Sequence, residues 1–211
     1  MLIGRKEELR ELNDAFKSEY SEFVAVYGRR RVGKTFLVRE AFNYEFTFQH
    51  TGVAKEKIAG QLAAFRTSLI DYGYKDCPEL ASWPDAFNSL KVGIKSSRKK
   101  KKVIFIDEIS WMDTPKSNFV SALEHFWNSW CSARKDVLLI ICASATSWII
   151  NKVIKDRGGL HNRVNTQIYL MPFTLKECEE YLQSRNIRIN RYQILTLYMV
   201  MGGPAYYWSL L

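Results

Sequence analysis

The chain contains the sequence GRRRVGKT at residues 28–35, which fits the pattern G-x-x-x-x-G-K-[ST] without a mismatch. This segment follows an apolar stretch that predicts a strand, and it precedes a segment that predicts a helix. In such a loop, glycines let backbone N–H groups turn inward around an anion, Lys34 reaches the β- and γ-phosphates, and the Thr35 hydroxyl ligates Mg²⁺. A chance glycine turn ahead of a helix is the alternative interpretation. The predicted nucleotide-binding residues are Gly28, Arg29, Arg30, Arg31, Val32, Gly33, Lys34, Thr35 and Phe36.

Two adjacent carboxylates, Asp107 and Glu108, follow a second apolar stretch at residues 103–106. Ligands of open α/β sheets bind at the carboxyl ends of the strands, where this pair would lie. We expect Asp107 to hold Mg²⁺ and Glu108 to orient and polarise an attacking water. An acidic pair after a strand is by itself more often a solvated loop. The phosphate loop upstream favours the catalytic interpretation.

A third apolar stretch, residues 137–143, leads into Ser144. If the two strands are neighbours, a hydroxyl at this strand tip lies beside the phosphate loop and can sense the γ-phosphate or position a water. Capping of the following helix by residues 144–147 is an equally good interpretation of the same residues.

The elements that must position these groups alternate along the chain. Short unbroken apolar runs bounded by charged loops predict parallel strands covered by helices on both faces. The alternation predicts a doubly wound α/β sheet. The predicted strands are residues 22–27, 45–51, 103–106, 137–143 and 167–171. The predicted helices are residues 5–18, 34–42, 54–72, 83–92, 118–132, 174–183 and 191–211, the last interrupted by Gly202, Gly203 and Pro204.

Length and composition narrow the class of protein. A chain of 211 residues with 47% hydrophobic and 25% charged side chains predicts one globular domain, or one domain with a small appendage. No stretch approaches the about 20 apolar residues of a membrane span, and the first residues lack the features of a signal peptide, so we expect a cytoplasmic protein. The cysteines form no C-x-x-C pair and the histidines have no metal-ligand spacing, which argues against disulfides and zinc.

The net charge of +9 suggests a polyanionic partner such as nucleic acid. Nine of the 31 basic residues, however, lie in two short segments, residues 29–31 and 95–102, and the remaining basic residues equal the 22 acidic ones. The first segment belongs to the phosphate loop. The second is either a DNA-binding loop or a solvated loop that leads into a buried strand.

Taken together, the motifs resemble the prokaryotic, archaeal-type P-loop ATPases related to the AAA+ and STAND groups. The resemblance implies an α/β P-loop NTPase fold of the ASCE and AAA+ type, a parallel sheet flanked by helices, with ATP and Mg²⁺ as cofactors. It implies a nucleotide-binding domain at residues 1–172 and the beginning of a helical lid at 173–211, and we expect the chain to be an N-terminal fragment. The motifs lie at residues 3–9, 27–35, 105–108, 142–145, 159–163, 172–173 and 202–204.

The same resemblance implies roles for residues near both ends of the chain. The segment with Leu2, Ile3 and Arg5 is expected to line the adenine pocket, although it also reads as an ordinary helix start. Pro204 is expected to pack against the nucleobase from the lid, although by composition residues 202–204 are only a helix breaker.

Two further residues receive roles in the chemistry. Ser144 matches the sensor hydroxyl of the family, but Ala143 stands where members commonly carry glycine. Arg163 matches an arginine that acts as a finger or sensor for transition-state charge, in cis or from a neighbouring subunit; a lone loop arginine is as often solvated.

The sequence therefore predicts Mg²⁺-dependent ATP binding and hydrolysis, with Glu108, Lys34, Ser144 and Arg163 as catalytic residues and Thr35 and Asp107 as metal ligands. One alternative is a slow nucleotide-dependent switch that controls assembly or signalling, with a homo-oligomer as its output. Another is a DNA-associated ATPase or loader that binds DNA through residues 95–102.

Overall fold

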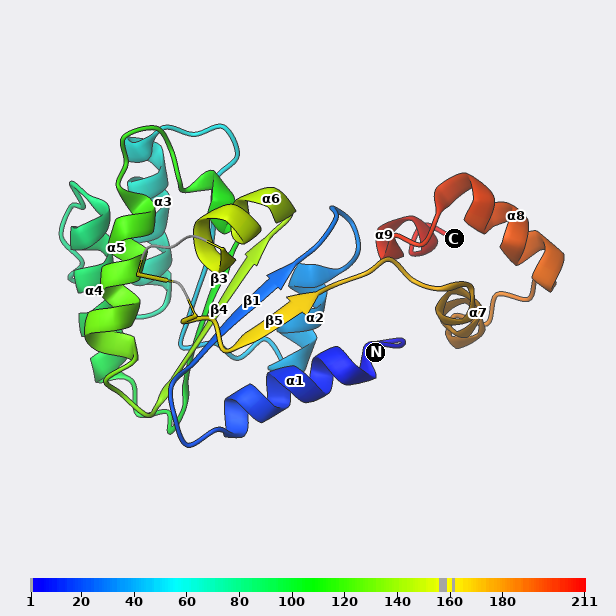
Figure 1. Cartoon of the computed structure of the whole chain (residues 1–211), viewed down its shortest axis with the longest axis horizontal. Helices are drawn as coiled ribbons and strands as arrows, with labels where there is room; N and C mark the ends of the chain where they lie inside the picture. The colour runs from blue at the N-terminus through cyan, green and yellow to red at the C-terminus, as the bar shows by residue number, and fades with distance from the viewer. Residues whose placement is uncertain (1, 156–158, 161) are drawn as a thin grey trace.

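The computed structural model describes residues 2–155, 159–160 and 162–211. In this part of the chain, five parallel strands form one sheet in the order β2-β3-β4-β1-β5. Helices cover both faces of the sheet, which confirms the predicted α/β class (Figure 1). The strands are β1 Glu22–Tyr27, β2 Phe48–Thr51, β3 Lys102–Asp107, β4 Val137–Ala143 and β5 Thr166–Tyr169.

The helices fall into two layers and a separate group. Figure 1 shows α3, α4 and α5 on one face of the sheet, α1 and α2 on the other, and α7, α8 and α9 together beyond the end of β5. The α-helices are α1 Lys6–Lys17, α2 Lys34–Ala41, α3 Ile58–Asp71, α4 Trp83–Ser96, α5 Phe119–Phe126, α6 Thr146–Ile149, α7 Leu175–Ser184, α8 Arg191–Met201 and α9 Ala205–Trp208. Shorter helical turns lie at Ile109–Trp111, Trp127–Cys131 and Ile150–Ile154.

The apolar runs of the sequence become the middle layer of this sandwich. Alternate residues of β1 face opposite sides: Phe23 and Ala25 pack with the layer of α3 to α5, whereas Val24 and Val26 pack with α1 and α2. All residues of β4 are buried, because helices cover both of its faces. The period-two pattern is absent from these strands because both faces are apolar.

Several predicted boundaries were wrong, each for a local reason. β2 begins at Phe48 rather than at residue 45, because the chain after α2 makes a turn in which Asn43 and Tyr44 have φ of 49° and 61°. α3 begins at Ile58 rather than at 54, since residues 53–57 form a loop. The predicted helix 118–132 keeps α geometry only to Phe126 and continues as a π-helix.

Residues 173–211 have a hydrophobic cluster of their own. Its buried members come from α7, α8, α9 and the segment before them: Phe173, Cys178, Leu182, Ile194 and Trp208. Thr174 caps the N-terminus of α7, because its Oγ1 accepts from the Glu177 N–H at 3.2 Å and the Glu177 carboxylate accepts from the Thr174 N–H at 2.7 Å. Residues 202–204 interrupt the last helical segment, as predicted, so that α8 ends before them and α9 begins after them.

No helix in the described residues is long and apolar enough to cross a membrane. The four cysteines, Cys77, Cys131, Cys142 and Cys178, are buried free thiols.

Candidate nucleotide-binding site

The glycine-rich loop connects the carboxyl end of β1 to the start of α2, as its sequence predicts. Gly28 has φ of +146°, and a Cβ there would lie 2.4 Å from the carbonyl oxygen of Leu170. Gly33 has φ of +96° and directly precedes Lys34, the first residue of α2. Only glycine adopts these conformations readily. The loop therefore passes close to the residue that follows β5 and delivers its lysine at a helix N-terminus.

Lys34 is 6% exposed, and its ammonium group is held by three oxygens. Nζ donates to the carbonyl oxygens of Gly28 and Arg29 at 3.0 and 2.8 Å, and to Ser144 Oγ at 3.0 Å. A buried ammonium needs such partners, because an unpaired charge away from water is strongly destabilising. The charge is thereby fixed inside the loop that its own backbone forms.

Thr35, in the first turn of α2, contacts Asp107, the last residue of β3. Thr35 Oγ1 donates to Asp107 Oδ2 at 2.6 Å, and the Glu108 N–H donates to Asp107 Oδ1 at 2.9 Å. Burial raises the pKa of Asp107, while hydrogen bonds from Thr35, Cys142 and the Glu108 N–H act in the opposite direction. A hydroxyl and a carboxylate oxygen in contact are the hard oxygen donors that Mg²⁺ takes, together with phosphate oxygens and water. Among the described residues, no group of three or more His, Cys, Asp or Glu could hold a metal by itself.

Glu108 directly follows β3 and turns toward β4. Its φ of +45° lies in the left-handed region, which aims the carboxylate away from the strand direction. Ser144 Oγ donates to Glu108 Oε1 at 2.7 Å, and the Ser144 N–H donates to Oε2 at 3.3 Å. Because the Ser144 hydroxyl also accepts from Lys34, one serine links the lysine of the loop to the acidic pair.

A cavity of 740 Å³ opens between this cluster and the helices at 173–211. Residues from both parts of the chain line it. Of the sequence-predicted site residues, the cavity contains Ile3, Arg5, Arg31, Val32, Gly33, Lys34, Thr35, Phe36, Glu108 and Ser144. Leu2, named with the same pocket, also lines it. Sequence reasoning missed Leu37, Phe173, Tyr181, Ser184, Arg185, Ala205, Tyr206 and Ser209.

Only some of the missed residues left a trace in the sequence. Ala205 and Tyr206 directly follow residues 202–204, the turn that the family resemblance places beside the nucleobase. Their position next to this turn was the available signal. Tyr181 and Arg185 lie in and just after α7, an ordinary amphipathic helix whose spacing says nothing about a ligand. Their position follows from how α7 packs.

Two residues assigned to the base end of the site have mainly structural contacts. Arg5 is 6% exposed, donates to the Met171 carbonyl oxygen at 2.7 Å and lies 5.0 Å above the Phe173 ring. Pro204 does not line the cavity, whereas its neighbour Ala205 does. Gly203 approaches Phe173 so closely that a Cβ would lie 2.0 Å from the Phe173 carbonyl oxygen. The turn therefore holds α9 against the segment that contains Phe173 and precedes α7.

Arg163 lies apart from the cluster. It is exposed and precedes β5, whose first residue, Thr166, pairs with Val24 near the start of β1. The phosphate loop follows the opposite end of β1, so this arginine and the cavity lie at opposite ends of the sheet within one chain. Gly28, Arg29, Arg30 and Asp107 also do not line the cavity, although Lys34 and Thr35 contact Gly28, Arg29 and Asp107 directly.

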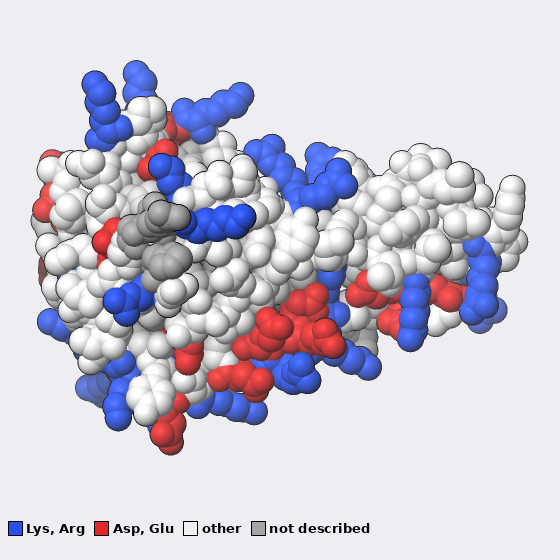
Figure 2. All heavy atoms as spheres, viewed as in Figure 1, with Lys and Arg blue, Asp and Glu red and all other residues white. Residues whose placement is uncertain are grey.

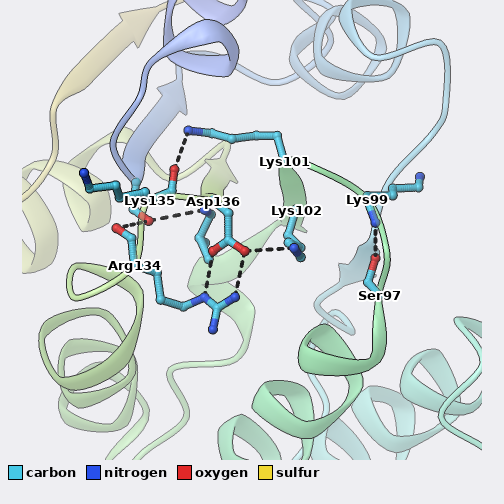
Figure 3. A network of polar contacts seen from close by, with 9 residues as sticks. Ser97, Lys99, Lys101, Lys102, Arg134, Lys135 and Asp136 are labelled. Atoms are coloured by element: carbon cyan, nitrogen blue, oxygen red, sulfur yellow. Dashed lines mark hydrogen bonds and ion pairs between the residues drawn. The ribbon is translucent and has the colours of Figure 1, made fainter.

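The second basic segment, residues 95–102, lies at the amino end of β3. Figure 3 shows Lys101 and Lys102 turned toward residues 134–136, which lead into β4. Lys101 Nζ donates to the carbonyl oxygens of Ser18, Tyr20 and Lys135 at 2.9, 2.6 and 3.4 Å. Lys102 pairs with Asp136 at 2.8 Å, and Lys99 donates to the Phe46 carbonyl oxygen at 3.2 Å. Three of the six basic side chains in residues 95–102 therefore bond to other loops of the protein.

Basic side chains form several separate groups on the visible surface (Figure 2). On the face drawn in Figure 2, lysine and arginine side chains stand at several separate positions around the outline, with acidic side chains between some of them. The geometry gives no continuous track for a nucleic-acid backbone on this face.

The sheet order, the phosphate loop and the acidic pair define a P-loop NTPase with an AAA+-like fold. The chain belongs to a family of ATPase domains found predominantly in Archaea. The sequence pattern of this family matches residues 2–208. The resemblance inferred from the sequence motifs is thus confirmed.

Three proteins are similar to the chain in sequence or in fold. An uncharacterized protein of Methanocaldococcus jannaschii is 26% identical over 209 residues, which cover 98% of this chain and 43% of that protein. The Walker-type ATPase of Pyrococcus abyssi has a TM-score of 0.65 at 16% identity, covering 96% of this chain and 65% of the other. A STAND protein with a tetratricopeptide repeat sensor from Pyrococcus horikoshii has a TM-score of 0.60 at 21% identity, covering 100% and 29%. The chain thus spans less than half of the relative from M. jannaschii.

Proposed function

We propose that this domain binds ATP together with Mg²⁺ and hydrolyses the bond to its γ-phosphate. The observation that carries the proposal is the connected set of hydrogen bonds that joins Lys34, Ser144 and Glu108 at the edge of the cavity. Thr35 and Asp107 stand in contact beside it. A lysine, a hydroxyl, a metal-binding carboxylate and a water-activating carboxylate are the groups that phosphoryl transfer to water requires.

The phosphate groups bind in the loop that Gly28 and Gly33 shape. Backbone N–H groups at the N-terminus of α2 face the anion, and the helix dipole adds to their attraction. Lys34 supplies a buried cation inside the loop, which exchanges loop carbonyl oxygens for phosphate oxygens without leaving the site. Thr35 and Asp107 would hold Mg²⁺, which would supply positive charge to the phosphate groups when bound.

Glu108 acts on the nucleophile. Its carboxylate orients a water molecule in line with the γ-phosphorus and accepts a proton from it, while the bond from that phosphorus to the bridging oxygen breaks. Ser144 holds the carboxylate through its hydroxyl and its N–H, so the carboxylate does not turn away toward solvent. Positioning of this kind supplies most of the rate, since the protein takes little part in covalent chemistry.

The nucleoside lies between the two parts of the chain. Residues 1–172 form the nucleotide-binding domain, and residues 173–211 form the beginning of a helical lid with its own hydrophobic cluster. Ile3 and Arg5 from the first part and Tyr206 from the second line the same cavity, which supports a base site between them. Pro204 contributes by holding α9 in place rather than by contact with the base.

Arg163 acts from a neighbouring subunit in a homo-oligomer. Its exposure and its position at the opposite end of β5 from the phosphate loop support a role in trans. Mixing experiments test this role. Arg163→Ala and Glu108→Gln should each be inactive alone, and the mixture should regain part of the turnover, because mixed interfaces combine an intact site with an intact arginine. A mixture no more active than its components would contradict action in trans.

The main proposal is tested by nucleotide binding and turnover in wild type, Lys34→Ala and Glu108→Gln. Lys34→Ala should lose binding and turnover, and Glu108→Gln should bind ATP but turn it over at least about 100-fold more slowly. Lys100→Ala is the matched control, since this exposed lysine precedes β3 and so lies at the end of the strand opposite Asp107. Undiminished turnover in both site variants would overturn the assignment.

A second candidate function is a slow nucleotide-dependent switch for assembly or signalling. The contact of the phosphate-loop residue Arg31 with Tyr206 and Tyr207 of α9 favours it, because occupancy of the loop then has a direct route to the lid. Equal oligomeric state and equal hydrogen exchange of α7 to α9 in ATP and in ADP would exclude the switch. Because Lys99, Lys101 and Lys102 are engaged within the protein, we do not propose DNA binding through residues 95–102.

A further inference from the structure

Arg31 occupies an unusual place in the phosphate loop. It stands at the third variable position, has φ of +68° and lines the 740 Å³ cavity together with Lys34. A residue with a side chain rarely adopts this left-handed conformation, and such strain persists only where surrounding contacts hold it. The contacts that hold Arg31 come from α9.

Four contacts join Arg31 to two consecutive tyrosines. Its carbonyl oxygen accepts from the Tyr206 N–H at 3.1 Å, which fixes the backbone at the strained position. Its guanidinium carbon lies 5.1 Å from the ring centres of both Tyr206 and Tyr207. The guanidinium also donates to the Tyr207 hydroxyl. In Figure 1 the loop after β1 lies beside α9, so the lid touches the nucleotide-binding domain here.

The two tyrosines differ in their relation to the cavity. Tyr206 lines it, whereas Tyr207 does not. Tyr207 can therefore influence a bound nucleotide only through Arg31 or through the position of α9. Arg31, in turn, is a cation that faces both the phosphate site and two aromatic rings, and such a cation is attracted to either partner.

We infer that Tyr206 and Tyr207 are positioning residues for the phosphate loop, and that Arg31 couples this loop to helices α7 to α9. This coupling rests on the proposed nucleotide binding. The tyrosines hold Arg31 in the left-handed conformation that the loop needs to present its N–H groups. By thermodynamic linkage, phosphate binding changes the hold on α9 by the same factor by which α9 changes phosphate affinity.

The test is a double-mutant cycle between Arg31→Ala and Tyr207→Leu, read as ATP affinity and as hydrogen exchange of amides in residues 28–33 and 205–208. Tyr207→Leu alone should weaken ATP binding about fivefold to tenfold and speed exchange in the loop. In the Arg31→Ala background the same change should alter ATP affinity less than about twofold, because the partner is already gone. Tyr207→Phe removes only the hydroxyl and should give an intermediate effect.

Tyr192→Leu is the matched control, since Tyr192 is 78% exposed on α8 and should leave both readouts unchanged. A purely structural role for Tyr207 would lower thermal stability yet leave the exchange of residues 28–33 as in wild type, which overturns the inference. Equal effects of Tyr207→Leu with and without Arg31 overturn it too. Wild type that binds no ATP defeats the proposed function and the coupling, while exchange of the loop in the unliganded variants still decides the positioning role.

Discussion

Two lysines at opposite ends of the sheet make similar hydrogen bonds but have different roles. Lys34 at the carboxyl end and Lys101 at the amino end each donate to three oxygens of the protein. The acceptors of Lys101 are carbonyl oxygens of the α1–β1 loop and of the loop before β4, so its side chain links these two loops to the start of β3. One acceptor of Lys34 is instead the Ser144 hydroxyl, which leads on to Glu108 and to a cavity.

The role of each lysine therefore follows from the oxygens that accept its hydrogen bonds and not from its charge alone. Burial lowers the pKa of Lys101, although Glu22 and Asp136 oppose the shift. Lys34 lines the 740 Å³ cavity, whereas Lys101 does not. The basic group at Lys34 is thus accessible to a ligand, whereas Lys101 bonds to other loops of the protein.

The largest expected effect comes from Lys34→Met, which removes the cation from the carboxyl end. Turnover of ATP should fall by about 100-fold to 1000-fold, because a fixed donor to the transferred phosphoryl group is lost. Steady-state kinetics and a binding titration measure it. Circular dichroism should show a folded protein, so that loss of activity is not loss of fold. If Lys34→Met kept its turnover, the contrast between the two ends would disappear.

The same substitution at the amino end should act on stability alone. Lys101→Met leaves three carbonyl oxygens without their charged donor, and we expect the free energy of unfolding to fall by about 1–2 kcal/mol. Urea denaturation measures this change. ATP affinity should stay within about twofold of wild type. A large loss of ATP affinity at unchanged stability would reverse the roles assigned to the two ends.

The ion pairs of Asp136 give the amino end a pH dependence. Burial alone would raise the pKa of Asp136, but hydrogen bonds and charges from Arg134 and Lys102 lower it to about 2. The stabilising contribution is therefore full above about pH 4 and is lost as the pH falls toward 2. Asp136→Asn should destabilise the protein by about 1 kcal/mol at pH 7, with a difference that shrinks in acid. Denaturation curves at a series of pH values measure it; a constant difference would contradict the ion-pair explanation.

The smallest effect is expected for the basic side chains of residues 95–102 that have no polar partner. The side chains of Lys95, Arg98 and Lys100 make no hydrogen bond or ion pair with any described residue. Replacing all three by Gln should change stability by less than about 0.5 kcal/mol. Fluorescence anisotropy with duplex DNA at varied salt provides a second readout. A salt slope that falls by about three on this change would restore the DNA-binding alternative.

Much of the fold could be predicted because it is encoded locally. The unbroken apolar runs at 103–106 and 137–143 can only be buried on both faces, which demands helices on either side of a parallel sheet. Boundaries were less predictable, as at β2 and α3, because the turns before them depend on particular hydrogen bonds that the residue pattern does not indicate. Gln61, for example, binds the backbone of Val53 with its side chain and keeps the residues before α3 in a loop.

By itself, the sequence determined the phosphate loop and the acidic pair, since the conformation of each lies within a few contiguous residues. The tertiary packing brings the separate groups together: Ser144 with both Lys34 and Glu108, Arg31 with Tyr207, and Lys101 with the loops before β1 and β4. It also separated Arg163 from the cavity. The physical reason is that strand order and helix packing bring together residues far apart in the chain, and neither spacing nor composition records those neighbours.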